Sequence, residues 1–452
     1  MTDISGAPRP FARNKTGKTG LEDATAKSSS APAPVLGTGS RPNVIVVGAG
    51  IVGLCTAWHL AKQGATVTVF DPNPPGSGCS SGNAGAFSPG SIVPMATPST
   101  VLSAPSMLLR PSSALHVPPR YWLAAAPWLF RFIASATPAR ISAASEALAM
   151  LYRDAIDRHK AMLAEMDALN LIRLTGHLHL YRNEAQLAKD EASWQTRRMH
   201  GIPLERLSRK EIEALEPDIA ADYQIGMFLP GHGMTIDPLV MATTVAEETS
   251  RRQVRFVAEK VLRLVPEGGR IVGVEAGGKV HRADHTVVAA GMWSRELLRA
   301  IGYNVPLESQ RGYHIDVVDP GVSPSRPVIP ADRKVFITPM QGRLRVAGTV
   351  ELLGLDAPPT EKRARLLLND LAAVYPQVRL DKLQDNWMGH RPCLPDSLPV
   401  IGSARKWAGL WCAFGHGHLG LTGAAVTGDL IANLLCSRPV KVDLAPFSVD
   451  RF

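Results

Sequence analysis

Three glycines with the spacing Gly-x-Gly-x-x-Gly follow a run of β-branched residues near the beginning of the chain. The run 44–47 is typical of a strand buried on both faces of a parallel sheet. At such a turn the first glycine permits the tight bend, the second lets a pyrophosphate approach the backbone, and the third lets helix and strand pack closely. The following helix presents free N–H groups and a positive dipole end to phosphates. We therefore predict a diphosphate site formed by Gly48, Ala49, Gly50, Ile51, Val52 and Gly53.

An acidic residue stands where a ribose would lie. Asp71 ends the second predicted strand, 66–70, about 20 residues after Gly50. Its carboxylate is placed to accept hydrogen bonds from ribose hydroxyls, and its charge disfavours the 2′-phosphate of NADP. The alternative, a glycine-rich turn without a nucleotide, is disfavoured because strand, glycines, helix and acid fall in register within one βαβ unit.

The segment after Asp71 distinguishes an FAD-binding protein from an NAD-binding protein. An NAD enzyme would continue with regular β/α alternation, whereas residues 72–85 form a long loop of turn-forming residues. Their backbone N–H groups suit a diphosphate or a flavin edge, so we predict FAD. The alternative is a plain surface loop. The loop residues assigned to the cofactor are Pro72, Ser80, Ser81, Gly82, Asn83, Ala84 and Gly85.

A second glycine-rich turn lies near the end of the chain. The predicted strand 411–414 runs into it, and an apolar helical pattern, 424–435, follows. A helix N-terminus of this kind stabilises the negative charge that a reduced flavin carries at N1 and C2=O. Two histidines in the turn lack a nearby carboxylate or cysteine, so no metal site is predicted. The turn residues assigned to the flavin are Gly415, His416, Gly417, His418, Leu419, Gly420 and Leu421.

These motifs together resemble the D-amino-acid oxidase superfamily of flavoproteins, in particular its D-amino-acid dehydrogenase (DadA-like) branch. The resemblance extends over 42–452 and is carried by the segments 48–71, 81–85, 286–291, 391–402 and 415–423. A closer similarity to the glyphosate oxidoreductase subgroup is carried by 231–236, 311–315 and 345–351. One departure is Asp71, where many FAD proteins carry Glu, which makes the same contact with a longer reach. The resemblance also assigns Val261, Ala290, Gly291 and Trp293 to the cofactor.

The resemblance implies oxidation of the Cα–N bond of a small amino acid or amine by hydride transfer from Cα to flavin N5, and the resulting imine hydrolyses to an oxo acid. Arg391 would hold the substrate carboxylate with its planar guanidinium; a structural arginine bonded to loop carbonyls is the alternative. Tyr313 would donate to the carboxylate and His314 would tune the amine proton, although strand alternation sends these two side chains to opposite faces. His416 would line the flavin pocket or cap the turn.

The electron acceptor separates the remaining alternatives. A dehydrogenase of this branch passes electrons to a quinone or respiratory chain, whereas a glycine- or sarcosine-type amine oxidase uses oxygen. An FAD-binding electron-transfer subunit of a larger dehydrogenase is a third class. The aromatic segment 121–133 is too short to span a bilayer, and Pro127 and Arg131 interrupt it. Its aromatic side chains can make peripheral membrane contact, but a buried helix or a domain contact is favoured on general grounds.

Composition agrees with an enzyme of the cytoplasm, peripheral at most on the inner face of the membrane. The 452 residues are 45% hydrophobic, and the five cysteines form no C-x-x-C pair or disulfide framework. The net charge of +9 arises from 49 basic and 40 acidic residues without a basic block, so no nucleic-acid partner is expected.

The predicted fold class is α/β, with a Rossmann-type FAD-binding domain and a discontinuous α+β substrate domain built on an antiparallel sheet. The predicted divisions are a tail at 1–41, FAD-binding segments at 42–90, 231–301 and 388–452, and substrate segments at 91–230 and 302–387.

Overall fold

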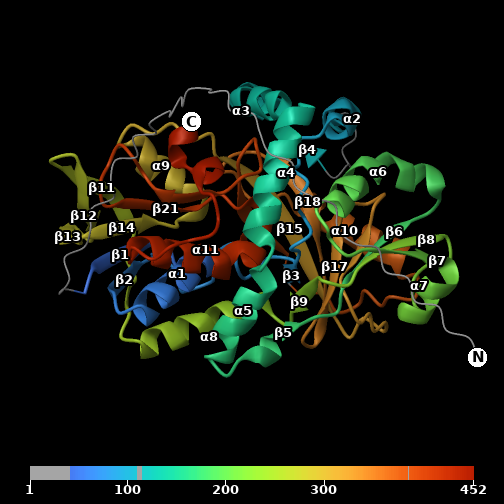
Figure 1. Cartoon of the computed structure of the whole chain (residues 1–452). Helices are drawn as coiled ribbons and strands as arrows, with labels where there is room; N and C mark the ends of the chain where they lie inside the picture. The colour runs from blue at the N-terminus through green and yellow to red at the C-terminus, as the bar shows by residue number, and fades with distance from the viewer. Residues whose placement is uncertain (1–40, 109–114, 385) are drawn as a thin grey trace, which may run out of the picture. The chain divides into compact units, whose positions relative to one another are not determined.

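The computed structural model describes residues 41–108, 115–384 and 386–452. Two large sheets organise these residues, and helices pack against them (Figure 1). The tail predicted at 1–41 lies outside the described residues apart from Arg41.

A six-stranded sheet carries the nucleotide turn. Its strand order is β10-β2-β1-β14-β21-β20, and all neighbours are parallel except β20, which runs antiparallel to β21. β1 therefore lies inside the sheet, between β2, the next strand along the chain, and β14, which comes from a distant part of the chain. The strands are β1 (Asn43–Val47), β2 (Thr66–Phe70), β10 (Arg255–Val257), β14 (His285–Val288), β20 (Val400–Ser403) and β21 (Leu410–Phe414).

Alternate residues of β1 enter two separate cores. Val44 and Val46 pack with helices α1 (Ile51–Lys62), α8 (Pro238–Arg251) and α11 (Gly420–Leu435) on one face. Ile45 and Val47 pack on the other face against a small antiparallel sheet and α9 (Ser294–Arg299). Burial on both faces explains why the run 44–47 is entirely β-branched.

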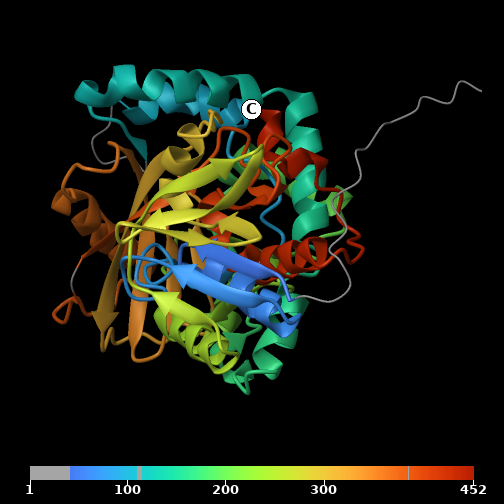
Figure 2. The ribbon, with the colours of Figure 1, turned by 90° about the vertical axis from the view of Figure 1, so that its left-hand side faces the viewer.

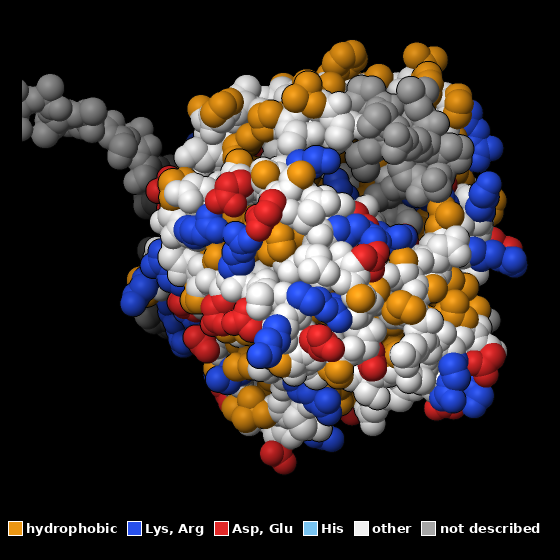
Figure 3. Space-filling model, turned by 90° about the vertical axis from the view of Figure 1, so that its right-hand side faces the viewer, with side chains coloured by type: hydrophobic (Ala, Val, Ile, Leu, Met, Phe, Trp, Pro, Cys, Tyr) orange, Lys and Arg blue, Asp and Glu red, His pale blue; other side chains and the backbone are white. Residues whose placement is uncertain are grey.

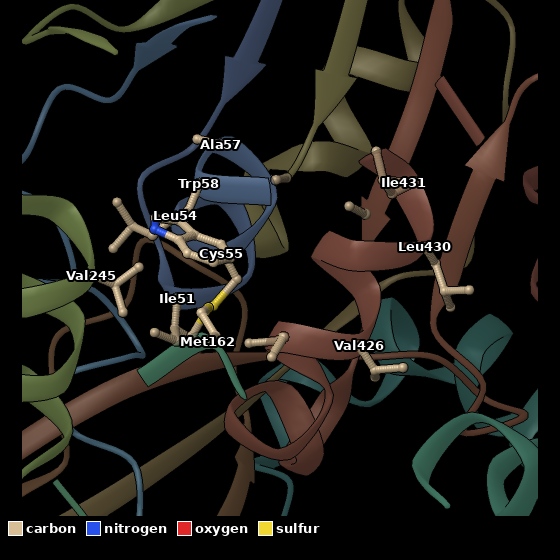
Figure 4. Close-up of a cluster of buried hydrophobic side chains, with 14 of the residues drawn as sticks. Ile51, Leu54, Cys55, Ala57, Trp58, Met162, Val245, Val426, Leu430 and Ile431 are labelled. Carbon is tan, nitrogen blue, oxygen red and sulfur yellow. The ribbon is translucent and has the colours of Figure 1, made fainter. Parts of the chain in front are cut away.

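Helices α1 and α11 lie against each other (Figure 4). Their contact is close because a Cβ at Gly428 would stand 2.7 Å from the backbone of Cys55. Figure 4 also shows Leu54 and Trp58 of α1 and Val426 and Ile431 of α11 in this core. The two helices most closely tied to the predicted cofactor site are therefore fixed against each other.

A nine-stranded sheet forms the second layer, seen from another side in Figure 2. Its order is β19-β15-β18-β17-β16-β6-β8-β7, with β4 paired to β18; most neighbours are antiparallel, while β16–β6 and β18–β4 are parallel. Helix α10 (Glu361–Val374) packs on it through Ala364, Leu367 and Leu371. The strands are β4 (Leu115–His116), β6 (His177–Tyr181), β7 (Glu205–Ser208), β8 (Ile225–Leu229), β15 (Glu308–Val318), β16 (Val328–Pro330), β17 (Phe336–Met340), β18 (Arg343–Leu352) and β19 (Trp387–Cys393).

Two small sheets and further helices complete the described residues. One sheet joins β3 (Ala86–Phe87), β9 (Gly233–Thr235) and β5 (Ile172–Arg173), and the other joins β11 (Val261–Glu267), β12 (Arg270–Ala276) and β13 (Lys279–Arg282). The remaining α-helices are α2 (Pro98–Leu108), α3 (Trp122–Ser135), α4 (Pro138–Tyr152), α5 (Ala155–Ala164), α6 (Glu184–Met199) and α7 (Arg209–Leu215).

The predicted α/β class is confirmed, and the structure differs from prediction in detail. We expected 273–275 and 280–283 to join the nucleotide sheet, but β12 and β13 pair with β11 in a sheet of their own. The predicted division at 387/388 would cut β19, whose residues pair with β15 in the nine-stranded sheet. No described helix combines the length and apolar character needed to cross a membrane.

Candidate active site

The glycine turn after β1 leaves no room for a side chain at its first and third glycines. Gly48 has a φ of +110°, and a Cβ there would lie 2.5 Å from the carbonyl oxygen of Ala289. A Cβ on Gly53 would lie 2.0 Å from the carbonyl oxygen of Gly48. The turn thus has the close backbone approach that the glycine spacing predicts.

The first turn of α1 offers hydrogen-bond donors. The N–H of Ile51 donates to Ser80 Oγ at 2.9 Å, whereas those of Gly50 and Val52 have no acceptor among the described residues. Asp71 accepts from the N–H of Ala49 at 2.8 Å through Oδ2 and from the N–H of Asn73 at 2.9 Å through Oδ1. Each carboxylate oxygen keeps a lone pair for a hydroxyl, and the free N–H groups at the dipole end suit an anion.

One cavity of about 1240 Å³ joins the predicted cofactor residues. It extends from the glycine turn to the distal glycine loop and to the strands of the nine-stranded sheet. Most predicted cofactor residues line it: Gly48, Ala49, Gly50, Ile51, Val52, Asp71, Pro72, Ser80, Gly82, Asn83, Ala84, Val261, Ala290, Gly291, Trp293, Gly415, His416, Gly417, His418, Leu419, Gly420 and Leu421.

Three predicted cofactor residues lie behind the cavity wall. Gly53 serves helix packing, as described above. The Ser81 hydroxyl donates to the carbonyl oxygens of Ser77 and Gly78 within its own loop. Gly85 has a φ of +68° and donates its N–H to Asn83 Oδ1 at 2.6 Å. Ser81 and Gly85 thus stabilise the loop 72–85, and Gly53 lets α1 pack closely against the turn.

The distal glycine loop leads into the N-terminus of α11. Gly415 and Gly417 have φ values of +81° and +55°. Burial lowers the pKa of His416 to about 4, and its Nε2 is hydrogen-bonded to Thr427 Oγ1. Burial, and then the charge of Arg391, lower the pKa of His418 to about 3, and its Nε2 meets Gln310 Oε1 at 3.2 Å. Both imidazoles are therefore neutral near pH 7, and His416 ties the loop to its own helix.

Arg391 is a partly buried cation on the cavity wall. Its Nη1 donates to the carbonyl oxygen of Thr349 at 2.9 Å. Its guanidinium lies over Gly312, where a Cβ would stand 2.1 Å from Cζ. Burial lowers the pKa of Arg391, and no described carboxylate lies within ion-pair distance of it. A partly buried guanidinium that has unused donors and faces the cavity suits an anionic ligand.

Thr349 holds an unusual backbone conformation beside Arg391. The β15–β18 ladder pairs Arg311 with Glu351 and Tyr313 with Gly348, so Thr349 and Val350 face the single residue Gly312 in a bulge. Thr349 has a φ of +56°, and among the described non-glycine residues with positive φ it alone is β-branched. Such a conformation is rare and costs energy. Here it accompanies the carbonyl that holds the guanidinium.

The structure places Tyr313 and His314 outside the cavity lining. The Tyr313 hydroxyl donates to Glu351 Oε2 at 2.6 Å beneath the sheet. His314 Nδ1 meets the carbonyl oxygen of Gly82 at 2.9 Å, and its ring stacks on Trp387. The Tyr313 hydroxyl is thus held by Glu351 and His314 by the loop that contains Gly82, and the substrate contacts predicted for both residues stay predictions.

The comparisons with known proteins agree with this geometry. The family model described as FAD dependent oxidoreductase (DAO) matches residues 43–434. The chain belongs to this family. It is 34% identical over 416 residues to a D-amino-acid oxidase of Bradyrhizobium diazoefficiens, covering 91% of this chain and 99% of that protein. It is 30% identical over 416 residues to a D-amino acid dehydrogenase of the same organism, covering 90% and 98%. The crystal structure of glycine oxidase from Geobacillus kaustophilus superposes with a TM-score of 0.70 at 22% identity, covering 91% of this chain and 99% of that one.

Membership of the DAO family makes the chain an FAD-dependent oxidoreductase, and its residues fit that cofactor. Gly48 and Gly53 allow no side chain. The N–H groups of Gly50 and Val52 have no acceptor among the described residues, and Asp71 retains acceptors. The cavity is larger than the roughly 300–1,000 Å³ of a typical ligand pocket, so it accommodates a dinucleotide and a small substrate together.

Several cavity residues of this DAO-family chain were not predicted. Phe336, Val350, Trp387 and His390 reach the cavity from the nine-stranded sheet, and α3 contributes Trp128, Leu129, Phe132 and Ile133. Arg345, outside the lining, donates to the carbonyl oxygens of Ser81 and Asn83 and pairs with Asp316. The aromatic residues of 121–133 are a sequence signal that could have identified the α3 contribution to the cavity. No local motif marked the sheet residues, since strand register brings them together.

Proposed function

We propose that this chain oxidises the Cα–N bond of a small amino acid to an imine, which water converts to an oxo acid and ammonia or a smaller amine. The substrate class comprises D-amino acids and glycine-, sarcosine- or glyphosate-like amines. The observation that carries the proposal is Arg391, a partly buried cation without a carboxylate partner among the described residues, on the wall of the cavity that holds the nucleotide turn.

Each group of residues has a role in this reaction. Arg391 binds the substrate carboxylate through the guanidinium donors that Thr349 leaves free. Phe336 and Val350 from the sheet, with Phe132 from α3, wall the substrate side with apolar groups and exclude water. The N-terminus of α11 favours negative charge at the flavin side of the cavity. FAD, when bound, supplies the acceptor for the hydride leaving Cα.

The relatives support two acceptor classes. Similarity to a D-amino acid dehydrogenase favours a quinone or respiratory-chain acceptor, and this is the acceptor we propose. Similarity to a D-amino-acid oxidase favours oxygen as the second candidate. In both cases the substrate loses two electrons and two protons before hydrolysis.

The test is a substrate screen with purified, FAD-loaded protein. D-amino acids, glycine, sarcosine and glyphosate are offered in turn, and reduction of an artificial dye and formation of peroxide are followed in parallel. Dye reduction without stoichiometric peroxide supports the dehydrogenase, and stoichiometric peroxide in air supports the oxidase. Bound FAD without turnover of any amine would overturn the proposal and favour an electron-transfer subunit.

A further inference from the structure

The segment between Asp71 and Glu146 has a one-sided charge. Residues 72–145 contain four arginines and no Asp, Glu or Lys, although the chain as a whole carries 40 acidic residues. This segment includes α2 and α3. A partner with negative charge meets no acidic side chain from this part of the chain.

Helix α3 is apolar on two faces. Its inner face buries Ala125 and Trp128, and Leu129 and Phe132 line the cavity. Its outer face exposes Leu123 at 92% and Phe130 at 71%, with Trp122 and Ile133 about half exposed. A helix that is apolar on all sides is normally buried in a protein core or in lipid. The outer face of α3, however, is exposed to solvent in the described residues.

Helix α2 extends the same surface. Thr100, Val101 and Ala104 line the cavity, while Leu102 turns outward and is 81% exposed. In Figure 3 hydrophobic side chains gather along the upper edge of the molecule, the level at which α2 and α3 lie in Figure 1. We call Leu102, Trp122, Leu123, Phe130 and Ile133 the α2–α3 apolar surface.

Arginines flank this surface. Arg120 and Arg131 are exposed near the two ends of α3, and Arg140 is exposed in the first turn of α4. None of these three makes an ion pair with a described carboxylate, and Arg140 donates to the carbonyl oxygen of Ala134. Their charges are therefore free to meet phosphate groups.

We propose that the α2–α3 apolar surface binds an anionic lipid surface, with α3 lying in the plane of the headgroups. Protruding apolar side chains flanked by arginines, with an indole at one end, are the features of an interfacial helix. A helix of 14 residues is too short to span the bilayer. The absence of acidic side chains in 72–145 favours lipid over a second copy of this chain, whose same surface would repeat the positive charge.

The position of α3 connects this surface to the cavity. Ile133 is exposed and also lines the cavity, so the lipid-facing and cavity-facing sides of the helix meet there. A lipid-soluble acceptor would enter from this side, and in that respect alone the inference rests on the proposed function. Lipid binding itself requires no turnover.

The test is flotation of the full FAD-loaded chain with vesicles of phosphatidylcholine alone or with phosphatidylglycerol added. The wild-type protein should float with the anionic vesicles and much less with the neutral ones. Replacing Leu123→Glu and Phe130→Glu together should lower the bound fraction at least tenfold, while Met199→Glu, at a residue 69% exposed on α6, should leave it unchanged. Replacing Arg120→Glu and Arg131→Glu should remove the preference for anionic vesicles, while Arg365→Glu on α10 should not.

Bound flavin and the melting temperature confirm that each variant is folded. Failure of the wild-type protein to bind either vesicle would overturn the proposal. The proposal would also be overturned if the wild-type protein binds no lipid and Leu123→Glu with Phe130→Glu converts a dimer to a monomer. The surface would then be an interface between two copies of the chain. Amine-dependent dye reduction in detergent-free buffer tests the proposed function separately, since a lipid-binding protein can lack it and a non-binding protein can retain it.

Discussion

The nucleotide turn and the Arg391 site are adjacent in one cavity but are built from the chain in opposite ways. The turn uses β1, α1 and β2, which follow one another in sequence, and its glycines are required by contacts within that unit and with β14. The Arg391 site needs three strands, β15, β18 and β19, whose register places Arg391 over Gly312 and beneath the Thr349 carbonyl. A contiguous motif thus forms the nucleotide part of the cavity, whereas pairing between distant strands forms the part around Arg391.

The largest effect, a loss of FAD affinity, is expected from a substitution in the glycine turn after β1. A Cβ at Gly53 would lie 2.0 Å from the carbonyl oxygen of Gly48, so Gly53→Ala must move α1 away from β1. We expect FAD affinity to fall at least 100-fold, measured by flavin absorbance of the purified protein and by titration of the apoprotein with FAD. The matched control is Gly64→Ala, which has open space but a φ of +91° and should cost about 1 kcal/mol of stability with FAD binding intact. Unchanged FAD affinity in Gly53→Ala would contradict this account of the turn.

Next in size is removal of the guanidinium. Arg391→Ala should raise the KM for the amino acid and lower kcat/KM by roughly 10² to 10³, or about 3 to 4 kcal/mol, because a charge-assisted pair with the carboxylate is lost. Arg391→Lys should recover only part of this, since an ammonium lacks the planar fork. Flavin absorbance should stay normal in both variants. An unchanged KM with FAD bound would show that Arg391 is a structural residue serving the Thr349 carbonyl.

A smaller effect should separate the position of Arg391 from its charge. In Gly312→Ala the guanidinium is present, but the new Cβ would stand 2.1 Å from its Cζ. The displaced guanidinium should cost roughly 10- to 100-fold in kcat/KM, mostly through KM, with FAD affinity preserved. Gly231→Ala is the control, because nothing lies within 4 Å of its added Cβ. If both variants match the wild type in KM, the strand register does not set the carboxylate site.

The same contrast explains what could be predicted from sequence. Gly48, Gly50 and Asp71 line the cavity and Gly53 lies behind its wall. Their spacing can be read from sequence because strand, turn, helix and acid follow one another in one βαβ unit. The distal turn at 415–421 is likewise recognisable from local sequence, because a strand, a glycine-rich turn and a helix follow one another there.

The substrate side was predictable only in part. Arg391 reaches the cavity as expected, but the bulge at Thr349 shifts the ladder by one residue and leaves Tyr313 bonded to Glu351 beneath the sheet. Such a shift arises from pairing between segments about 40 residues apart, and no local pattern reports it.

The smallest predicted effect concerns the protons of two buried histidines that lie outside the cavity lining. The N–H of Gly90 donates to His232 Nε2, His232 Nδ1 meets His177 Nδ1 at 3.1 Å, and His177 Nε2 meets the carbonyl oxygen of Gly233. This order requires both rings to be neutral, each with one proton, because a further proton would leave two donors facing each other.

Burial lowers the pKa of His177 from 6.5 to about 4, and burial together with His177, His179 and Arg197 lowers that of His232. The unfolded chain therefore binds protons that the folded chain excludes. This contribution to stability is complete above about pH 6.5 and is lost as the pH falls toward 4.

His177→Gln should accordingly make the free energy of unfolding less dependent on pH between 6.5 and 4, by at most about 1.4 kcal/mol per pH unit. Urea unfolding at several pH values measures the slope, and His200→Gln at the C-cap of α6 serves as the control. FAD affinity should be the same in all three proteins, because His177 lies on β6 and His232 just before β9, and neither is part of the nucleotide turn. A slope equal to that of the wild type would mean that the pair accepts a proton without breaking, and the fixed proton order inferred from the Gly90 contact would then be wrong.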